Sequence, residues 1–188
     1  AIPWFIGVFY ADGDTRRDTE IREGAPRSLD TLDYAERRID NIDELALFGE
    51  ATWPLAPKLS LSTGVRIFRS TLDVQSSAQW RGGGLASASE QLSESGIAPD
   101  IRLRYQPNSS FLAYLSAARG YRAGGFNTGG LASLDAQRST QPWRRYAGDE
   151  IWTFELGAQG RLLNDRLHLS AIAFQSDWRD VQTDTLVN

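Results

Sequence analysis

The stretch KLSLSTGVRIFRSTLDV, residues 58–74, decides the fold class of this chain. Its side chains alternate in character with a period of two, which is the repeat of a β-strand. The apolar face carries Leu59, Leu61, Thr63, Val65 and Ile67, and the opposite, mostly polar face carries Ser60, Ser62, Gly64, Arg66 and Phe68. The stretch therefore predicts a strand with one apolar side and one largely polar side.

The same alternation recurs along the chain. It is clear in residues 97–108 and 150–163, and it is less regular in four further segments. Those four segments are residues 4–10, 43–53, 110–120 and 166–178. No segment carries a sustained apolar stripe at helical spacing. We predict seven strands and no helix, which makes this an all-β chain.

The composition narrows the chemistry that the chain can perform. Its 188 residues contain no cysteine and one histidine, His168, and the formal net charge is −4. Disulfides, thiolate metal sites and multi-histidine metal sites are therefore excluded. A nucleic-acid partner requires a concentrated basic face, whereas arginine and acidic residues are mixed along this chain. We expect no metal, no other cofactor and no nucleic-acid partner.

The connections between the predicted strands alternate between short and long. Tight-turn residues follow Trp53, Gln106 and Leu163, in the strings PLAPK, PNSS and NDR. Long polar stretches lie between them, at about residues 11–41, 74–97 and 120–148. Loops of that length are uncommon in compact soluble domains. Short turns on one side and long loops on the other are typical of an outer-membrane barrel.

The strand lengths and the aromatic residues also favour a membrane barrel. A tilted strand needs roughly nine to eleven residues to cross the hydrocarbon layer, and several predicted strands reach that length. Aromatic residues near strand ends form a predicted interfacial girdle: Trp4, Tyr10, Trp53, Tyr105, Phe111, Trp152 and Trp178. We predict an antiparallel, up-and-down transmembrane β-barrel segment that contacts the lipid and lipopolysaccharide of a bacterial outer membrane.

Three segments resemble the barrel of TonB-dependent outer-membrane receptors, which import iron–siderophore complexes and related scarce nutrients. They are ALFGEATWPLAPKLSLSTGVRIF (46–68), PDIRLRYQPNSSFLAYLSAARGYRAGGFN (99–127) and DEIWTFELGAQGRLLNDRLHLSAIAFQSDWRDVQ (149–182). The resemblance implies a barrel of 22 strands with a plugged lumen. We therefore expect residues 1–188 to be one partial barrel domain, without the plug and without the plug segment that contacts the TonB complex.

The string GYRAGGFNTGG, residues 120–130, marks the exit of a strand into an external loop. A phosphate-binding loop would open a helix, but Pro142 and an irregular polar stretch follow instead. We predict that residues at both ends of this loop form a rim for an anionic, aromatic ligand such as a ferric siderophore. The rim residues are Arg119, Tyr121, Arg122, Phe126, Asn127, Trp143, Arg144, Arg145 and Tyr146. The alternative is that they hold the loop's shape or touch lipopolysaccharide phosphates.

Other candidate sites are weaker. Asp12 and Asp14 are not followed by the pattern of a twelve-residue Ca²⁺ loop. His168 has no assignable nucleophile, which argues against a hydrolase. Glu155 and Arg161 lie on the polar side of a predicted strand, where lumen hydrogen bonds are the expected role. We predict no catalytic residue and no enzyme activity.

The sequence leaves three function classes open. The first is part of an active importer that binds a scarce nutrient, with a ferric siderophore as the expected one, at external loops and uses energy from TonB. The second is a passive porin-like channel, which has similar strands but no plug. The third is a soluble β-rich binding module whose apolar strand faces pack on each other.

Overall fold

The computed structural model describes residues 2–23, 31–81, 85–127 and 145–183. All seven predicted strands are present in one antiparallel sheet, in the order β1-β2-β3-β4-β5-β8-β9. Their bounds are β1 Trp4–Glu23, β2 Thr31–Ala56, β3 Leu59–Trp80, β4 Leu85–Asn108, β5 Phe111–Arg122, β8 Asp149–Leu162 and β9 Leu167–Arg179. A second, two-stranded sheet pairs β6 (Gly125–Phe126) with β7 (Arg145–Tyr146). No helix, and hence no membrane-spanning helix, occurs in these described ranges.

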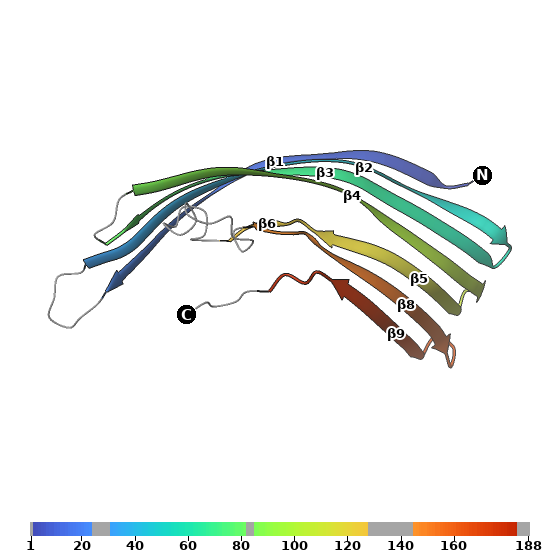
Figure 1. Cartoon of the computed structure of the whole chain (residues 1–188). Helices are drawn as coiled ribbons and strands as arrows, with labels where there is room; N and C mark the ends of the chain where they lie inside the picture. Colours follow the sequence, from blue (N-terminus) through green and yellow to red (C-terminus); the bar gives the residue numbers. More distant parts are fainter. Residues whose placement is uncertain (1, 24–30, 82–84, 128–144, 184–188) are drawn as a thin grey trace.

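The large sheet curves as an arc, and β6 lies on its concave side (Figure 1). Each strand pairs with the next one along the chain, except that β6 and β7 lie between β5 and β8 in sequence. This up-and-down order is the one that the sequence predicts. The arc and the order together make the sheet part of a barrel wall.

The pairing registers give the two faces of the sheet different chemistry. One row across the convex face consists of Trp53, Leu61, Leu103, Leu115 and Leu156. The neighbouring row on the concave face consists of Thr52, Ser62, Arg102, Ser116 and Glu155. Within the described residues no second layer covers the convex row, and its leucines at positions 103, 115 and 156 are exposed. The apolar side therefore faces outward, as lipid contact requires.

The short turns form where the sequence predicts them. The turn between β8 and β9 places Leu163, Asn164 and Asp165 in the left-handed region, with φ of 54°, 55° and 65°. Asn and Asp tolerate this conformation better than most residues, because their short side chains bond to the local backbone. The three short connections all lie at the same end of the sheet (Figure 1).

The strands extend further than the sequence predicts at the other end of the sheet. The prediction of polar loops over residues 11–41 and 74–97 is wrong, because most of these residues continue β1, β2, β3 and β4. At roughly 3.3 Å per residue, the 22 residues of β3 span about 70 Å. That length is well beyond the apolar band of roughly 25 Å in such barrels.

Polar cross-strand pairs stabilise these extensions in place of an apolar face. The Arg37 guanidinium lies 2.8 Å from the Asp18 carboxylate on the neighbouring strand. Further along the sheet, Gln91 donates a 2.8 Å hydrogen bond to Asp73. At this level the convex face is polar, and the concave face mixes polar residues with the apolar Val74 and Leu92, so the apolar–polar alternation disappears although the strand continues.

The predicted interfacial aromatics lie at two levels. Trp4, Trp53, Tyr105 and Phe111 lie on the convex side, toward the short turns. Tyr10 and Trp152 lie on the same side toward the other end of the apolar band. Trp178 is placed differently, because it pairs with Ile151 on the concave side and lies beneath the Arg122 guanidinium. Trp178 therefore faces away from lipid, contrary to the prediction, whereas contact of the six convex residues with the membrane interface stays a prediction.

The sheet divides where β5 leaves β4. The two strands pair only between Asp100 and Asn108 on β4, so β5 separates after Ala118. From there β5 passes along the concave side of the upper part of β4 (Figure 1). Above this point, the Arg119 side chain donates a 3.1 Å hydrogen bond to the Ile97 carbonyl and so links β5 to β4.

Candidate functional site

The connection between β5 and β8 folds back against the concave face. We call its described residues, 123–127 and 145–148, the inner hairpin. Its two short strands pair Gly125 with Tyr146 and Phe126 with Arg145. The Phe126 side chain is 5% exposed and packs against Val74 and Leu92 on the concave face. The inner hairpin therefore lies inside the arc.

A buried arginine anchors the hairpin to β2. Arg38 is 6% exposed and donates a 2.9 Å hydrogen bond to the Phe126 carbonyl. The Asp40 carboxylate lies 2.7 Å from the same guanidinium group. A buried arginine is tolerated only when a carboxylate and other acceptors satisfy it, and Arg38 meets that condition.

A carboxylate on β4 anchors the base of the hairpin. Glu94 accepts hydrogen bonds from the backbone amides of Gly124 and Gly148, at 2.9 and 3.3 Å, and from the Tyr121 hydroxyl. Burial, together with the hydrogen bond to Glu94, raises the pKa of Tyr121 above its ordinary value. The Glu94 carboxylate thus holds the entering and leaving arms of the hairpin together.

Glycine is required at both arms because the contacts are so close. A Cβ atom on Gly124 would lie 2.5 Å from the Tyr146 carbonyl oxygen and 2.8 Å from the Glu94 carboxylate. A Cβ atom on Gly148 would lie 2.9 Å from the Arg122 carbonyl oxygen and 2.9 Å from the Tyr121 ring. The glycine-rich sequence therefore serves close backbone packing at this point.

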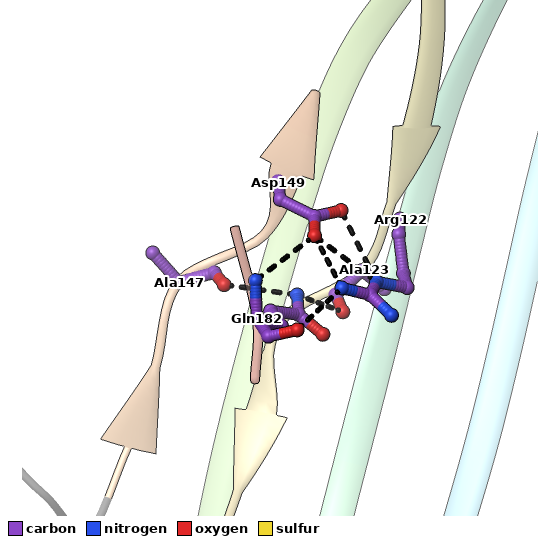
Figure 2. Close-up of polar contacts among 5 residues, drawn as sticks. All are labelled: Arg122, Ala123, Ala147, Asp149 and Gln182. Carbon is purple, nitrogen blue, oxygen red and sulfur yellow. Dashed lines mark hydrogen bonds and ion pairs between the residues drawn. The ribbon is translucent and has the colours of Figure 1, made fainter. Parts of the chain in front are cut away.

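A second polar cluster lies at the base of the hairpin (Figure 2). Asp149 is 3% exposed, and Arg122 Nε lies 3.2 Å from both of its oxygens. The backbone amide of Gln182 donates a 3.1 Å hydrogen bond to the same carboxylate. The Arg122 guanidinium holds the pKa of Asp149 below its ordinary value, and the Gln182 amide adds to this effect.

The side chain of Gln182 joins the two arms directly. Its amide nitrogen donates 3.0 Å hydrogen bonds to the carbonyls of Ala123 and Ala147 (Figure 2). Gln182 reaches this position because Asp180, with φ of 55°, turns the chain just after the end of β9. We call Gln182, Asp149 and Arg122 the amide clasp.

The structure brings several predicted rim residues together and separates others. Arg119 forms an ion pair with Glu150. Tyr121 bonds to Glu94, and Arg122 bonds to Asp149. Phe126 is buried. Asn127, Arg145 and Tyr146 are exposed. Trp143 and Arg144 lie outside the described residues. Contact of any of these residues with a ligand stays a prediction.

Sequence reasoning missed the residues that hold the hairpin. Arg38, Glu94 and Gln182 come from three different parts of the chain, and Asp149 lies at the start of β8. None of them belongs to a local motif that would signal its role. Glu155 lies on the concave side, as predicted, and accepts a hydrogen bond from Tyr114.

A family model described as TonB dependent receptor-like, beta-barrel, matches residues 3–188. The chain belongs to the TonB-dependent receptor family. Its place is accordingly the bacterial outer membrane. The resemblance noted in the sequence is confirmed over a longer range than residues 45–182.

The receptor segment is also similar in fold to a solved structure, the ferric yersiniabactin uptake receptor FyuA from Yersinia pestis. The TM-score is 0.77 at 18% sequence identity, over 98% of this chain and 27% of FyuA. The segment thus spans about a quarter of the length of that receptor. Proteins of this family are receptors and transporters, and no group of three or more His, Cys, Asp and Glu side chains in the described part of this one could hold a metal ion.

Proposed function

We propose that the protein containing this segment is an active importer that binds a ferric siderophore at its external loops and passes it through a plugged barrel with energy from TonB. Residues 1–188 then form one partial barrel domain of this receptor, and the plug lies elsewhere in the protein. The observation that carries the proposal is the family match over residues 3–188. The fold likeness to a ferric yersiniabactin receptor supports it.

The proposed ligand site contains two groups of residues: those that hold the inner hairpin in position and those that are exposed on it. Arg119, Tyr121 and Arg122 bond to protein carboxylates and so set the hairpin's position. Arg145 and Tyr146 are exposed on β7. A guanidinium and an aromatic ring suit an anionic, aromatic ligand. Asn127, Trp143 and Arg144 complete the proposed rim, whereas Phe126, which the sequence also assigns to the rim, is buried and holds the hairpin against the concave face.

Uptake of radiolabelled iron tests the proposed transport. The full-length receptor is expressed in cells that lack their own siderophore receptors, with and without TonB, and a panel of ferric siderophores is supplied. We expect uptake of at least one complex only in the cells with TonB. Equal uptake in both strains would indicate a passive channel, and no uptake of any complex would remove siderophores from the proposal.

Binding by purified receptor tests the predicted rim. We expect Arg145→Ala and Tyr146→Ala each to weaken binding of the transported complex about tenfold, which corresponds to roughly 1.4 kcal/mol. Arg166→Ala is the matched control, since Arg166 lies in the short turn at the other end of the wall. Unchanged affinity in both rim variants would place the ligand site elsewhere.

A further inference from the structure

Backbone pairing between β4 and β5 stops at a proline. The last paired residues are Asp100 and Ala118, so the next residue of β4 toward its outer end is Pro99. Gln106 donates its backbone amide to Lys58, so the even-numbered residues of β4 bond toward β3 and the odd-numbered ones toward β5. Pro99 is odd-numbered and has no N–H to donate, which ends the β4–β5 ladder at this point.

Beyond Pro99, one edge of β4 is open. The pairing with β3 continues without a register shift as far as Leu85, so the odd-numbered residues keep turning their N–H and C=O groups away from β3. Arg119 confirms this direction, because its side chain donates to the carbonyl of Ile97. No strand in the described part of the chain pairs with this edge. We call its row of exposed residues the β4 edge: Ser87, Ser89, Gln91, Ser93, Ser95 and Ile97.

The β4 edge has no neighbouring wall strand to cover it. In the up-and-down order that neighbour is β5, which passes along the concave side instead (Figure 1). Further strands of a barrel would join at β1 and β9, which are the outermost strands of the sheet. Residues 85–98 also contain neither lysine nor proline, the residues that commonly keep an exposed edge from pairing. The edge is therefore open to a strand from elsewhere.

The spacing of the backbone groups identifies the kind of partner. Residues 87–97 span about 30 Å at roughly 3.3 Å per residue, with an N–H and a C=O turned outward at every second residue. An extended polypeptide carries donors and acceptors at the same spacing, and it can add to such an edge as a further strand. The serines of the β4 edge are small, which leaves room for long side chains of the partner.

The outer face beside the β4 edge is acidic. Four carboxylates lie on the convex side in the two cross-strand rows that end at Ser93 and Gln91: Asp12, Asp14, Asp43 and Asp73. Of the two arginines in the adjoining rows, Arg16 forms an ion pair with Asp18. Arg69 is therefore left to offset four negative charges. Such a surface attracts a positively charged partner.

We propose that the β4 edge binds an extended, positively charged segment of another polypeptide on the external side of the membrane. The backbone of the segment bonds to the row from Ser87 to Ile97, and its lysine or arginine side chains point over the acidic rows. This binding goes beyond the proposed import of a siderophore, since it uses neither the inner hairpin nor TonB.

Peptide binding by the purified full-length receptor tests the proposal. The probe is a peptide of alternating lysine and threonine, as long as the β4 edge, and fluorescence anisotropy measures its dissociation constant. Ser93→Pro removes one outward N–H but no bond to β3, so we expect it to weaken binding about tenfold. Ser93→Thr is the matched control and should bind as the native receptor does. A peptide of alternating glutamate and threonine should not bind.

N-methylated peptides test the same backbone contact in the native receptor, so this result does not depend on the folding of Ser93→Pro. Methyl groups on the lysine amides block one edge of the peptide strand, and methyl groups on the threonine amides block the other. We expect one pattern to weaken binding at least about tenfold and the other to leave it unchanged. Equal binding of both peptides, equal binding of the acidic peptide, or no binding of the probe would overturn the proposal.

Hydrogen exchange distinguishes the other possible occupants of the β4 edge. In monomeric receptor without peptide, we expect the amides of Ser89, Gln91 and Ser93 to exchange rapidly, and a saturating amount of the probe should slow them at least about tenfold. Slow exchange already present in the monomer would mean that another segment of the receptor covers the edge. Slow exchange that appears only on dimerisation would identify a second copy. Either result would overturn the proposal, whereas a loss of siderophore uptake would leave it intact.

Discussion

The ring of Tyr121 packs 4.5 Å from the ring of Phe68, between centroids, at an interplanar angle of 40°. This contact joins β5 to the concave side of β3, although lower on β5 the same face of the strand, at Leu115, points outward. The change arises because β5 leaves β4 after Ala118 and passes along its inner side. Because the sheet divides at this point, the inner hairpin lies on the concave side of the arc.

Removing the Gln182 side chain should loosen the hairpin without unfolding the sheet. Gln182→Ala loses two hydrogen bonds, to the Ala123 and Ala147 carbonyls, each worth roughly 1 kcal/mol. We expect hydrogen exchange of the amides in residues 123–126 and 145–148 to speed up at least about tenfold. Gln159→Ala is the control, because Gln159 also lies on the concave side of the sheet, on β8. Equal exchange in the two variants would show that the clasp does not hold the hairpin.

The amide clasp should weaken only in acid. The Arg122 guanidinium lowers the pKa of Asp149, so the folded state binds that proton less readily than the unfolded state does. The stabilisation is then fully present above the unfolded pKa of about 4 and is lost as the pH falls through the lower folded pKa. Arg122 also lies 5.5 Å from the Trp178 ring centre, so Trp178 fluorescence reports on the clasp.

A variant without the Asp149 carboxyl group tests whether this pH dependence belongs to Asp149. We expect the fluorescence to be constant from neutral pH to about pH 4 and to change below it. Asp149→Asn should abolish the transition, because the amide does not titrate. A transition near neutral pH, or one that persists in Asp149→Asn, would assign the effect to another group.

A methyl group at Gly124 should displace the hairpin. Gly124→Ala places a Cβ atom 2.5 Å from the Tyr146 carbonyl oxygen, and we expect a local cost of about 1–3 kcal/mol. Gly13→Ala is the control, because a Cβ atom there meets nothing within 4 Å. Hydrogen exchange of the hairpin should rise in the first variant only. Similar exchange in both would mean that the packing at Gly124 is not tight in solution.

A charge on the convex face should oppose insertion into lipid. Leu156 is exposed in the apolar row of β8, and an arginine there should cost about 2–4 kcal/mol near the bilayer midplane. Gln159→Arg places the same charge on the concave face of the same strand and should cost much less. Folding of the full-length receptor into lipid vesicles at a series of urea concentrations measures both. Equal urea midpoints for the two variants would contradict the assignment of Leu156 to the outer face and Gln159 to the inner face.

The sequence predicts the strands well where one side of the chain is apolar. Residues 58–74 alternate because Leu61, Val65 and Ile67 face outward while Ser62 and Arg66 face inward. The same reasoning fails above the apolar band, where Asp18 pairs with Arg37 on a strand that is polar on both sides. Periodicity reports a difference between two environments, so it disappears here, where the convex face is polar and the concave face buries both polar residues, such as Arg38, and apolar ones, such as Val74.

The inner hairpin could not be predicted from local patterns. Arg122 and Gln182 are 60 residues apart in sequence, and Gly124 and Glu94 are 30 apart. A glycine-rich string indicates close backbone approach, but it does not identify the approaching group. The sequence therefore places Tyr121 and Arg122 at a strand exit, and only the structure shows that the exit turns inward.

The division between β4 and β5 also has a mechanical consequence. Below Ala118 the two strands are joined by backbone pairing, whereas above it the described links run through the side chains of Arg119 and Glu94. A backbone ladder resists shear along its whole length, but side-chain links exchange with water one at a time. At the junction of β4 and β5 the sheet is therefore stiffer near the short turns than above Ala118, where the two strands can shift relative to one another.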